Sequence, residues 1–340
     1  MPVRQQQQCV RRVGESARSR GGHPRFSPAA MEVRQDGAMT AAPDFRLYHS
    51  NALDVLASLL AHALREPLPG QPLLAADTVL IPQVAMRRWL QSTLAAEYGI
   101  AANLEFLTPG EFVARALKAN VAGEHDDLGA SGLHWRLYAA LTDPALMRRP
   151  QMGGLRAYLD RDDPLRPWAL AAELGGVFEK YQAWRRDWLL RWEDGAEPDD
   201  PQAILWRHIA AGRQYRARRI NDYLARFEGA HQPLPQGLPG RLFAFATLNV
   251  SPDVLRVIAT QARVGTLHFY MPTPTRSYWG DLQTLGEKLR SGVVDPFGAE
   301  AAENPLLQAW GAAGRDFMAV LGSYEAVSYT HLTLPTNREV

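Results

Sequence analysis

Cysteine is nearly absent from this chain of 340 residues, where Cys9 is the single example. One cysteine cannot form a disulfide within the chain or build a cysteine-based metal site. This composition fits a reducing compartment, so we expect a cytoplasmic protein. Long hydrophobic runs are also missing, because no apolar stretch approaches the roughly 18 residues that a membrane span needs. We expect no membrane association, although a hydrophobic content of 46% with nine tryptophans can build a sizeable core.

Lysine is the second scarce residue, with only Lys118, Lys180 and Lys288 against 34 arginines. None of the three follows a glycine or precedes a serine or threonine, as the lysine of a phosphate-binding loop must. Neither Glu nor Gln stands two positions before any of them, so the Glu/Gln-x-Lys motif of metal-dependent nucleases is absent. No G-x-S-x-G elbow occurs either. We therefore expect no catalytic residues, no cofactor and no metal in this chain.

The stretch from Thr78 to Phe106 changes its apolar spacing twice. A short apolar run at 78–82 is typical of a buried strand. From Val84 onward, apolar residues recur three and four apart, which predicts a helix with one apolar face. Gly99 stands where a left-handed cap would end that helix, and a second apolar segment follows. Strand, helix and strand in this order predict the crossover unit that a parallel sheet needs.

The remaining elements follow from the same spacing. Strands are expected at 45–49, 242–248 and 266–271. Helices are expected after a cap at Asn51, at 111–120, 133–141, within 164–192, at 202–211 and 215–227, after a cap at Ser251 with Pro252, at 278–289 and at 306–324. The first helix is expected to bury Leu53, Leu56, Leu60 and Leu64. The sequence thus predicts an α/β fold, a mixed or parallel sheet flanked by helices and interrupted by a helical insertion.

Five blocks of sequence stand out in order along the chain. They read RLYHSNALDVL at 46–56, MRRWLQSTLAAEYGIAANLEF at 86–106, GLPGRLFAF at 237–245, RSYWGDL at 276–282 and NPLLQAWGAAGRDF at 304–317. In this order and spacing they resemble the amino-terminal part of the RecC family, the gamma subunits of exodeoxyribonuclease V (the RecBCD helicase–nuclease). The resemblance covers residues 45 to about 326.

The resemblance implies the fold of a superfamily 1 helicase motor that lacks its own ATPase. Where such a motor has its phosphate loop, this chain reads HSNALD at 49–54, with no glycine and no lysine. The resemblance also implies RecB-like and RecD-like partner subunits that bind ATP and magnesium, unwind and cut. This subunit would bind single- and double-stranded DNA as a non-catalytic scaffold and read the recombination signal Chi. The expected process is double-strand-break repair by homologous recombination.

The segment YQAWRRDWLLRW at 181–192 is the one pattern with binding chemistry. Single-stranded DNA is held by arginines on phosphates and by aromatic planes under bases. Trp184, Trp188 and Trp192 are four apart, and a helical stripe of this kind usually belongs to the core. We therefore expect the tryptophans to be structural, and Arg185 to project elsewhere and contact DNA.

The resemblance also implies a set of DNA-contacting positions. They are Thr108, Val177, Glu179, Lys180, Arg185 and Arg216. From the residues alone, the arginines at 213–219 form a solvated helix face. Four positions depart from the family: Thr108 replaces a leucine, Ala114 a tryptophan, Gly176 an aspartate and Lys180 a glutamine. These departures predict a different signal or no sharp Chi reading, and they leave the scaffold role untouched.

Five parts are expected along the chain. Residues 1–42 are expected to be a disordered extension or a mis-called start, and Met39 is the expected start. A helicase-like part follows at 43–110, a helical insertion at 111–235, the continued helicase-like part at 236–326, and an unrelated tail at 327–340. The tail predicts an amino-terminal fragment ending in unrelated sequence, and a natural short variant is the alternative. His125 beside Asp126 and Asp127 is expected to lie in a solvated acidic loop, because no further metal ligand has a defined spacing.

Two other functions stay open from the sequence. A stand-alone ATPase or nuclease of helicase fold is disfavoured by the missing lysine motifs, and ATP turnover by the isolated chain would revive it. An inert truncated fragment would expose an apolar face and aggregate on expression.

Overall fold

The computed structural model describes residues 44–72, 74–123, 128–160, 163–248, 250–274, 310–322 and 327–332. In these ranges, strands form one sheet in the order β3-β2-β4-β5-β1-β6, and every neighbouring pair is parallel. The strands are β1 (Asp44–Ser50), β2 (Asp77–Leu80), β3 (Leu104–Leu107), β4 (Arg241–Phe245), β5 (Thr266–Pro272) and β6 (Val327–Leu332). The predicted α/β fold class is confirmed, and the sheet is parallel throughout the described part.

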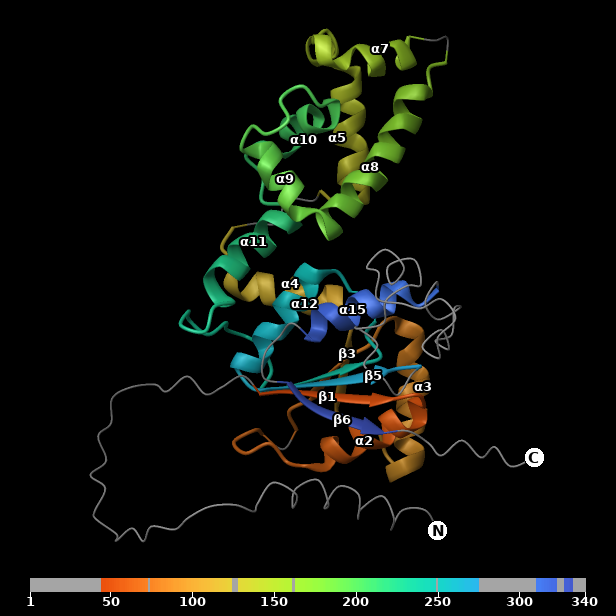
Figure 1. Ribbon diagram of the computed structural model, residues 1–340, viewed down its shortest axis with the longest axis vertical. Helices are drawn as coiled ribbons and strands as arrows, with labels where there is room; N and C mark the ends of the chain where they lie inside the picture. The colour runs from red at the N-terminus through yellow and green to blue at the C-terminus, as the bar shows by residue number, and fades with distance from the viewer. Residues whose placement is uncertain are drawn as a thin grey trace, which may run out of the picture. The chain divides into compact units, whose positions relative to one another are not determined.

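Helices cover both faces of the sheet (Figure 1). One face carries α2 (Leu53–Arg65) and α3 (Val84–Tyr98); the other carries α4 (Pro109–Asn120), α11 (Arg216–Phe227), α12 (Pro252–Ala259) and α15 (Ala312–Gly322). Successive β4 residues alternate between the two layers: Leu242 packs with α4 and α12, whereas Phe243 packs with α2 and α3. This alternation follows from the two-residue repeat of a strand, and it explains why β4 is buried along its whole length.

A second, all-helical core lies between α4 and α11 in the sequence. Its helices are α5 (Ala130–Thr142), α6 (Pro144–Met147), η1 (Pro150–Met152), α7 (Gly153–Leu159), α8 (Arg166–Trp184), α9 (Arg186–Glu193) and α10 (Pro201–Ala210). The short helix η2 (Thr260–Arg263) does not belong to this core and follows α12 in the sheet part. Phe178 and Trp206 are fully buried at its centre. Although α4 and α11 fall within the predicted insertion, both contribute to the core on the sheet. The exact domain boundaries stay a prediction.

The crossover unit predicted at 78–106 is confirmed, since α3 runs from Val84 to Tyr98 between two parallel strands. Gly99 caps it with a φ of 81°, the left-handed conformation that glycine adopts without strain. The cap predicted at Asn51 is wrong: Ala52 holds the cap position of α2, and its N–H donates to the Ser50 hydroxyl at 3.2 Å. Leu53 is also exposed rather than buried, because the helix starts only at that residue.

The region expected to be mostly helical at 164–192 contains two helices. α8 ends at Trp184, Arg185 adopts a non-helical conformation with φ −137° and ψ 38°, and α9 begins at Arg186. The sequence could not show this break, because no proline or glycine stands at it.

Several expectations concern residues outside the described ranges. These are the extension at 1–42, the loop with His125, Asp126 and Asp127, and the helix at 278–289. Of the helix predicted at 306–324, the structure gives α15 at Ala312–Gly322. Residues 327–332, which we expected to be unrelated to the fold, form β6 and pair with β1.

Candidate nucleic-acid interface

A cavity of about 290 Å³ lies at the carboxyl edge of the sheet. Pro82 follows β2, Thr108 follows β3, and Ser251 follows β4, so the ends of three parallel strands form one wall. Trp184, the last residue of α8, and Arg216, the first of α11, form the other wall. The lining is completed by Pro109, Gly110, Ala183, Leu248, Val250 and Val254. Open parallel sheets bind ligands at this edge, outside the carboxyl ends of their strands.

Arg216 is the cation of this cavity. Its guanidinium makes no hydrogen bond or ion pair with any residue that the structure describes. Burial lowers the pKa of Arg216 from its ordinary value, and the negative charge of Glu179 on α8 partly offsets this effect. An arginine stays charged throughout the physiological range even so. The cavity therefore contains a partly buried positive charge with no contacting counter-ion in the described chain.

Ser251 lines the same cavity and carries an unsatisfied, buried hydroxyl. The residue is 6% exposed, and its Oγ has no hydrogen-bond partner among the described residues. It holds the cap position of α12, as predicted, but it makes no side-chain cap hydrogen bond, which corrects that expectation. A buried polar group without a partner costs about 1–3 kcal/mol. Such a group calls for an explanation, and a ligand that completes its hydrogen bonding is one.

Thr108 also lines the cavity, but its hydroxyl already caps the start of α4. Its Oγ1 accepts the N–H of Glu111 at 3.3 Å, while Glu111 Oε2 accepts the Thr108 N–H at 2.7 Å. This reciprocal pair is a capping box. The hydrogen bond from the Thr108 backbone, followed by that from its side chain, lowers the pKa of Glu111. Thr108 thus shapes the wall, and its hydroxyl is engaged by the helix.

The three tryptophans do not form one buried stripe, which corrects the prediction. Trp184 is 46% exposed and Trp188 is 40% exposed, whereas Trp192 is buried and donates its Nε1–H to Glu197. The break at Arg185 explains the difference, because it interrupts the helical repeat that would have aligned them. The Arg185 side chain is exposed and places its guanidinium carbon 5.3 Å from the centre of the Trp188 ring, a cation–π distance.

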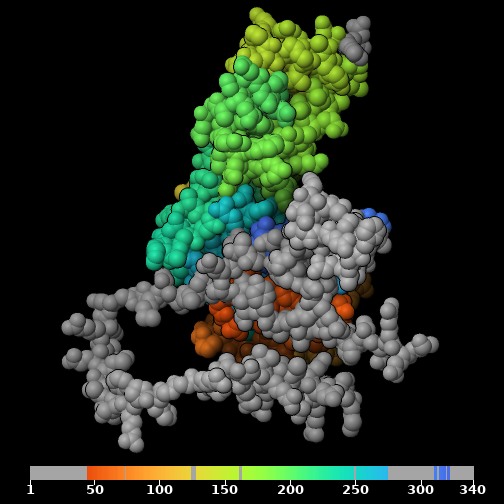
Figure 2. All heavy atoms as spheres, in the orientation of Figure 1, coloured from red at the N-terminus to blue at the C-terminus, as the bar shows by residue number. Residues whose placement is uncertain are grey.

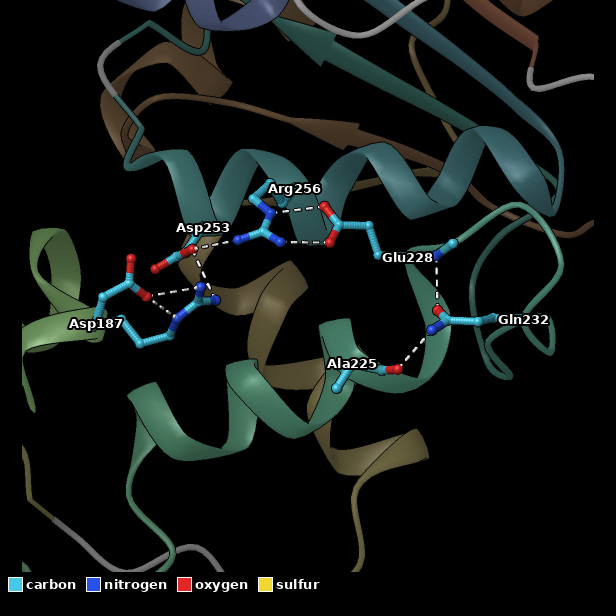
Figure 3. A network of polar contacts seen from close by, with 8 residues as sticks. Asp187, Ala225, Glu228, Gln232, Asp253 and Arg256 are labelled. Carbon is cyan, nitrogen blue, oxygen red and sulfur yellow. Dashed lines mark hydrogen bonds and ion pairs between the residues drawn. The ribbon is translucent and has the colours of Figure 1, made fainter. Parts of the chain in front are cut away.

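Arg186, the neighbour of Arg185, has a structural role instead. It is buried, and its Nη1 lies 2.9 Å from the Asp253 carboxylate on α12. Arg256 links the same Asp253 to Glu228, which follows α11, in the network of Figure 3. The surfaces of α11 and α12 adjoin in Figure 2, as their contacts require. This network ties α9 and the end of α11 to the helix that carries Ser251 at its start.

The arginines at 213–219 do not form a solvated face, contrary to prediction. Arg219 is buried and donates to the backbone carbonyls of Leu117, Val121 and Gly123, at and just beyond the end of α4. Arg218 pairs with Glu193 at the end of α9. The helix packs with this side inward because its arginines satisfy carbonyls and a carboxylate that burial would otherwise leave unpaired.

The structure brings together only part of the expected DNA-contacting set. Thr108 and Arg216 line the cavity, and Glu179 lies close enough to affect the charge of Arg216. Val177 is half-buried on α8 and Lys180 is exposed there, and neither lines the cavity. Two departing positions are also exposed, Ala114 on α4 and Gly176 on α8.

Sequence reasoning missed Ser251 as a site residue. It was identified only as a helix cap, although a Ser-Pro pair after a buried strand of a parallel sheet also marks the carboxyl edge. The pattern could not show that the hydroxyl would be left without a partner. Pro82 was likewise seen only as the end of a strand.

In a helicase motor, the turn between the first strand and its helix binds phosphate. The corresponding turn here, between β1 and α2, is built from different residues. His49 and Ser50 are buried at its start, and Ser50 Oγ already accepts the Ala52 N–H. Within the described ranges, no group of three or more His, Cys, Asp or Glu could hold a metal ion, and no helix is long and apolar enough to cross a membrane.

Fold and cavity together define a helicase-like α/β domain with a helical insertion and a cationic, tryptophan-edged cavity at the carboxyl edge of its sheet. Comparison with protein families matches residues 45–337 to the RecC amino-terminal domain. The chain belongs to that family. The match continues beyond residue 326, where we expected the resemblance to end.

Several curated proteins named RecBCD enzyme subunit RecC are similar to this chain. The protein of Escherichia coli (strain K12) is 29% identical over 326 residues, which cover 83% of this chain and 28% of that protein. The Haemophilus influenzae protein is 24% identical over 343 residues, covering 82% and 30%. The Mycolicibacterium smegmatis protein is 27% identical over 250 residues, covering 70% and 22%. The chain therefore spans less than a third of the length of these relatives.

Proposed function

We propose that this chain supplies a non-catalytic, DNA-binding part of a RecC subunit in an exodeoxyribonuclease V of the RecBCD type. Its process would be double-strand-break repair by homologous recombination. Family membership and the names of the relatives support the assembly. The observation that carries the binding role is the cavity at the carboxyl edge of the sheet, where Arg216 has no contacting counter-ion and Trp184 exposes part of its ring.

In this proposal the chemistry belongs to other subunits. RecB-like and RecD-like partners bind ATP and magnesium, unwind and cut, and the complex works in the cytoplasm. The missing lysine motifs support this division. So does the turn between β1 and α2, which carries buried side chains at 49–50 and neither glycine nor lysine.

The strand would pass along the surface formed by α8, α9 and the start of α11. Exposed Lys180 and Arg185 would contact phosphates, and exposed Trp184 and Trp188 would stack on bases. Thr108, Val177, Glu179 and Arg216 would complete the set proposed from the family. Because four positions depart from the family pattern, the recombination signal in DNA that this chain recognises would differ from that of the relatives.

Strand binding is tested by fluorescence anisotropy of a labelled single-stranded oligodeoxynucleotide titrated with the full chain. Replacing Arg185 with Gln should weaken binding and lower the slope of log affinity against log salt by about 0.7, the value for one phosphate contact on a single strand. Arg191→Gln is the matched control, because Arg191 is an exposed arginine on α9 that is not among the DNA-contacting positions proposed from the family. Absence of binding by the unaltered chain would overturn the binding role.

The assembly is tested by co-expression with a RecB-like helicase–nuclease and purification through a tag on that partner. We expect the chain to co-purify and to show no ATP turnover alone. ATP hydrolysis by the isolated chain would contradict the non-catalytic role, and failure to co-purify would contradict the partnership.

A further inference from the structure

Two polar groups in the cavity lack partners, and they come from different parts of the fold. Arg216 starts α11 next to the helical core, and Ser251 precedes α12 beside the sheet. Both line the same space of about 290 Å³. The Ser251 hydroxyl is buried and unpaired, and the Arg216 guanidinium has no contacting counter-ion among the described residues. Two residues that line one small cavity and carry a cation and a hydroxyl donor form a suitable pair for an oxyanion.

The start of α12 adds to the same preference. The first-turn N–H groups of a helix lack intrahelical partners, and its dipole favours negative charge at that end. Ser251 does not use its side chain to cap these groups. Pro252 brings no N–H, so the amides that follow it are the available donors.

Nearby acidic groups do not cancel this positive character. Asp253, in the first turn of α12, is engaged by Arg186 and Arg256. Glu111 keeps its negative charge, because the donors of Thr108 that it accepts are neutral, but its side chain is exposed and solvent screens it. Glu179 acts on Arg216 without forming an ion pair with it. The charge of Arg216 is therefore moderated and remains uncompensated.

We propose that Arg216 and Ser251 form a phosphate-binding site, with the guanidinium and the hydroxyl each donating to one phosphate at the start of α12. No covalent step is involved. A backbone phosphate of a nucleic-acid strand and a free inorganic phosphate share this chemistry. The strand is the source if the proposed function holds, because exposed Trp184 stands at the same cavity, where a base can stack beside the bound phosphate.

The test uses the full chain with Arg216→Gln and Ser251→Ala, and with Arg191→Gln as the charge-matched control. Affinity for a labelled single-stranded oligodeoxynucleotide is measured at several salt concentrations. We expect Arg216→Gln to weaken binding about tenfold or more, as for a hydrogen bond to a charged group, and Ser251→Ala to weaken it about threefold to tenfold. Arg216→Lys should keep the salt slope and recover part of the affinity. Thermal unfolding of each variant shows that the fold is kept.

A second arm separates the two sources of phosphate. Oligonucleotides with one uncharged methylphosphonate linkage, moved along the strand, should lose affinity at one position, and Arg216→Gln should abolish that loss. Inorganic phosphate is tested alone by the shift in melting temperature. A shift that Arg216→Gln removes, without any effect on strands, would assign the site to free phosphate.

The outcomes distinguish this site from the proposed function. If strands bind and Arg216→Gln behaves like Arg191→Gln, the site is wrong while the DNA-binding role stands. If phosphate binds through Arg216 and strands do not bind, the site stands and the DNA-binding role fails. If neither ligand responds to Arg216→Gln or Ser251→Ala, the proposal is overturned.

Discussion

The two ends of the sheet each carry a cavity with an arginine, and the two arginines differ. At the amino ends of the strands, a cavity of about 390 Å³ is lined by Asp77 and Arg241. Arg241 Nη2 lies 2.9 Å from both Asp77 carboxylate oxygens, and its Nη1 donates to the carbonyls of Ala63 and Glu66 at 3.0 and 2.7 Å. Every charge of this pair is matched from within the fold.

At the carboxyl ends, the smaller cavity is lined by Arg216 and Ser251, whose side chains have no hydrogen-bond or ion-pair partner in the described chain. The size of a cavity is therefore a poor guide to a ligand site in this molecule. The two cavities differ instead in their arginines, since Arg241 is fully paired within the fold whereas Arg216 has no contacting counter-ion in the described chain. The arginine at the amino end is used for folding, although the Tyr98 hydroxyl of that cavity is unpaired, and the arginine at the carboxyl end is left without a contacting partner.

The largest effect is expected from breaking the paired end. Arg241→Met leaves the Asp77 carboxylate without its cation in a site where Arg241 is only 9% exposed. We expect the free energy of unfolding to fall by about 3–5 kcal/mol, as when one partner of a buried ion pair is removed. Urea denaturation measures this. Arg115→Met is the control, since it breaks an exposed pair with Glu105 and should cost less than about 1 kcal/mol. Equal losses would contradict the comparison.

A pH dependence of similar size is expected from the sheet interior. Burial, followed by the positive charges of Arg46 and Arg241, lowers the pKa of His268 from 6.5 to about 4. Below pH 6.5, His268 binds a proton in the unfolded chain but stays neutral in the folded chain. The free energy of unfolding therefore falls as the pH falls from 6.5 toward 4. At about 1.4 kcal/mol for each pKa unit, the loss is about 3 kcal/mol.

The measurement is the free energy of unfolding in urea between pH 7 and pH 4, compared with His268→Phe. The variant keeps an aromatic ring against Phe243 and Tyr48 and removes the titrating group. Its stability should vary less over this range. An unchanged pH dependence in His268→Phe would assign the effect to other groups.

A much smaller effect on stability is expected at the unpaired end. Arg216→Met removes a partly buried cation that has no contacting counter-ion, so its desolvation cost disappears together with the charge. We expect the free energy of unfolding to stay within about 1 kcal/mol of the original, or to rise, because no ion pair or hydrogen bond of the described chain is lost. A loss as large as that of Arg241→Met would show that Arg216 holds the fold together, and the comparison would fail.

The smallest effect is expected at one of the positions that departs from the family. A Cβ added at Gly176 would meet nothing within 4 Å, and the residue is exposed on α8. Gly176→Asp should therefore change stability by less than about 0.5 kcal/mol, because only helix propensity and one solvated surface charge are altered. Thermal or urea unfolding would show it. A clear destabilisation would mean that the departure is required for folding and carries no information on the signal that is read.

Much of the fold could be predicted from the sequence because its signals are local. The repeat from Val84 and the glycine at 99 predict α3 and its end, and the buried apolar runs predict the strands. Non-local contacts could not be predicted. The break at Arg185 has no proline or glycine to mark it, and α9 is tied to α12 through the contact of Arg186 with Asp253.

The candidate site was only half predictable for the same reason. Arg216 and Thr108 entered through the family resemblance, and their place on one cavity was not visible in the spacing. Ser251 follows a buried strand, so its position at the carboxyl edge could be inferred. That its hydroxyl lacks a partner depends on how α12 meets α4 and α11, which a sequence pattern does not encode.

One measurement tests the central claim most directly: a double-mutant cycle of Arg216→Gln and Ser251→Ala, read as the affinity of the full chain for a single-stranded oligodeoxynucleotide. If the two side chains hold one phosphate, Ser251→Ala should weaken binding in the original chain and have little effect once Arg216 is replaced. Fully additive losses would contradict the account, because they would show that the two groups act at separate places.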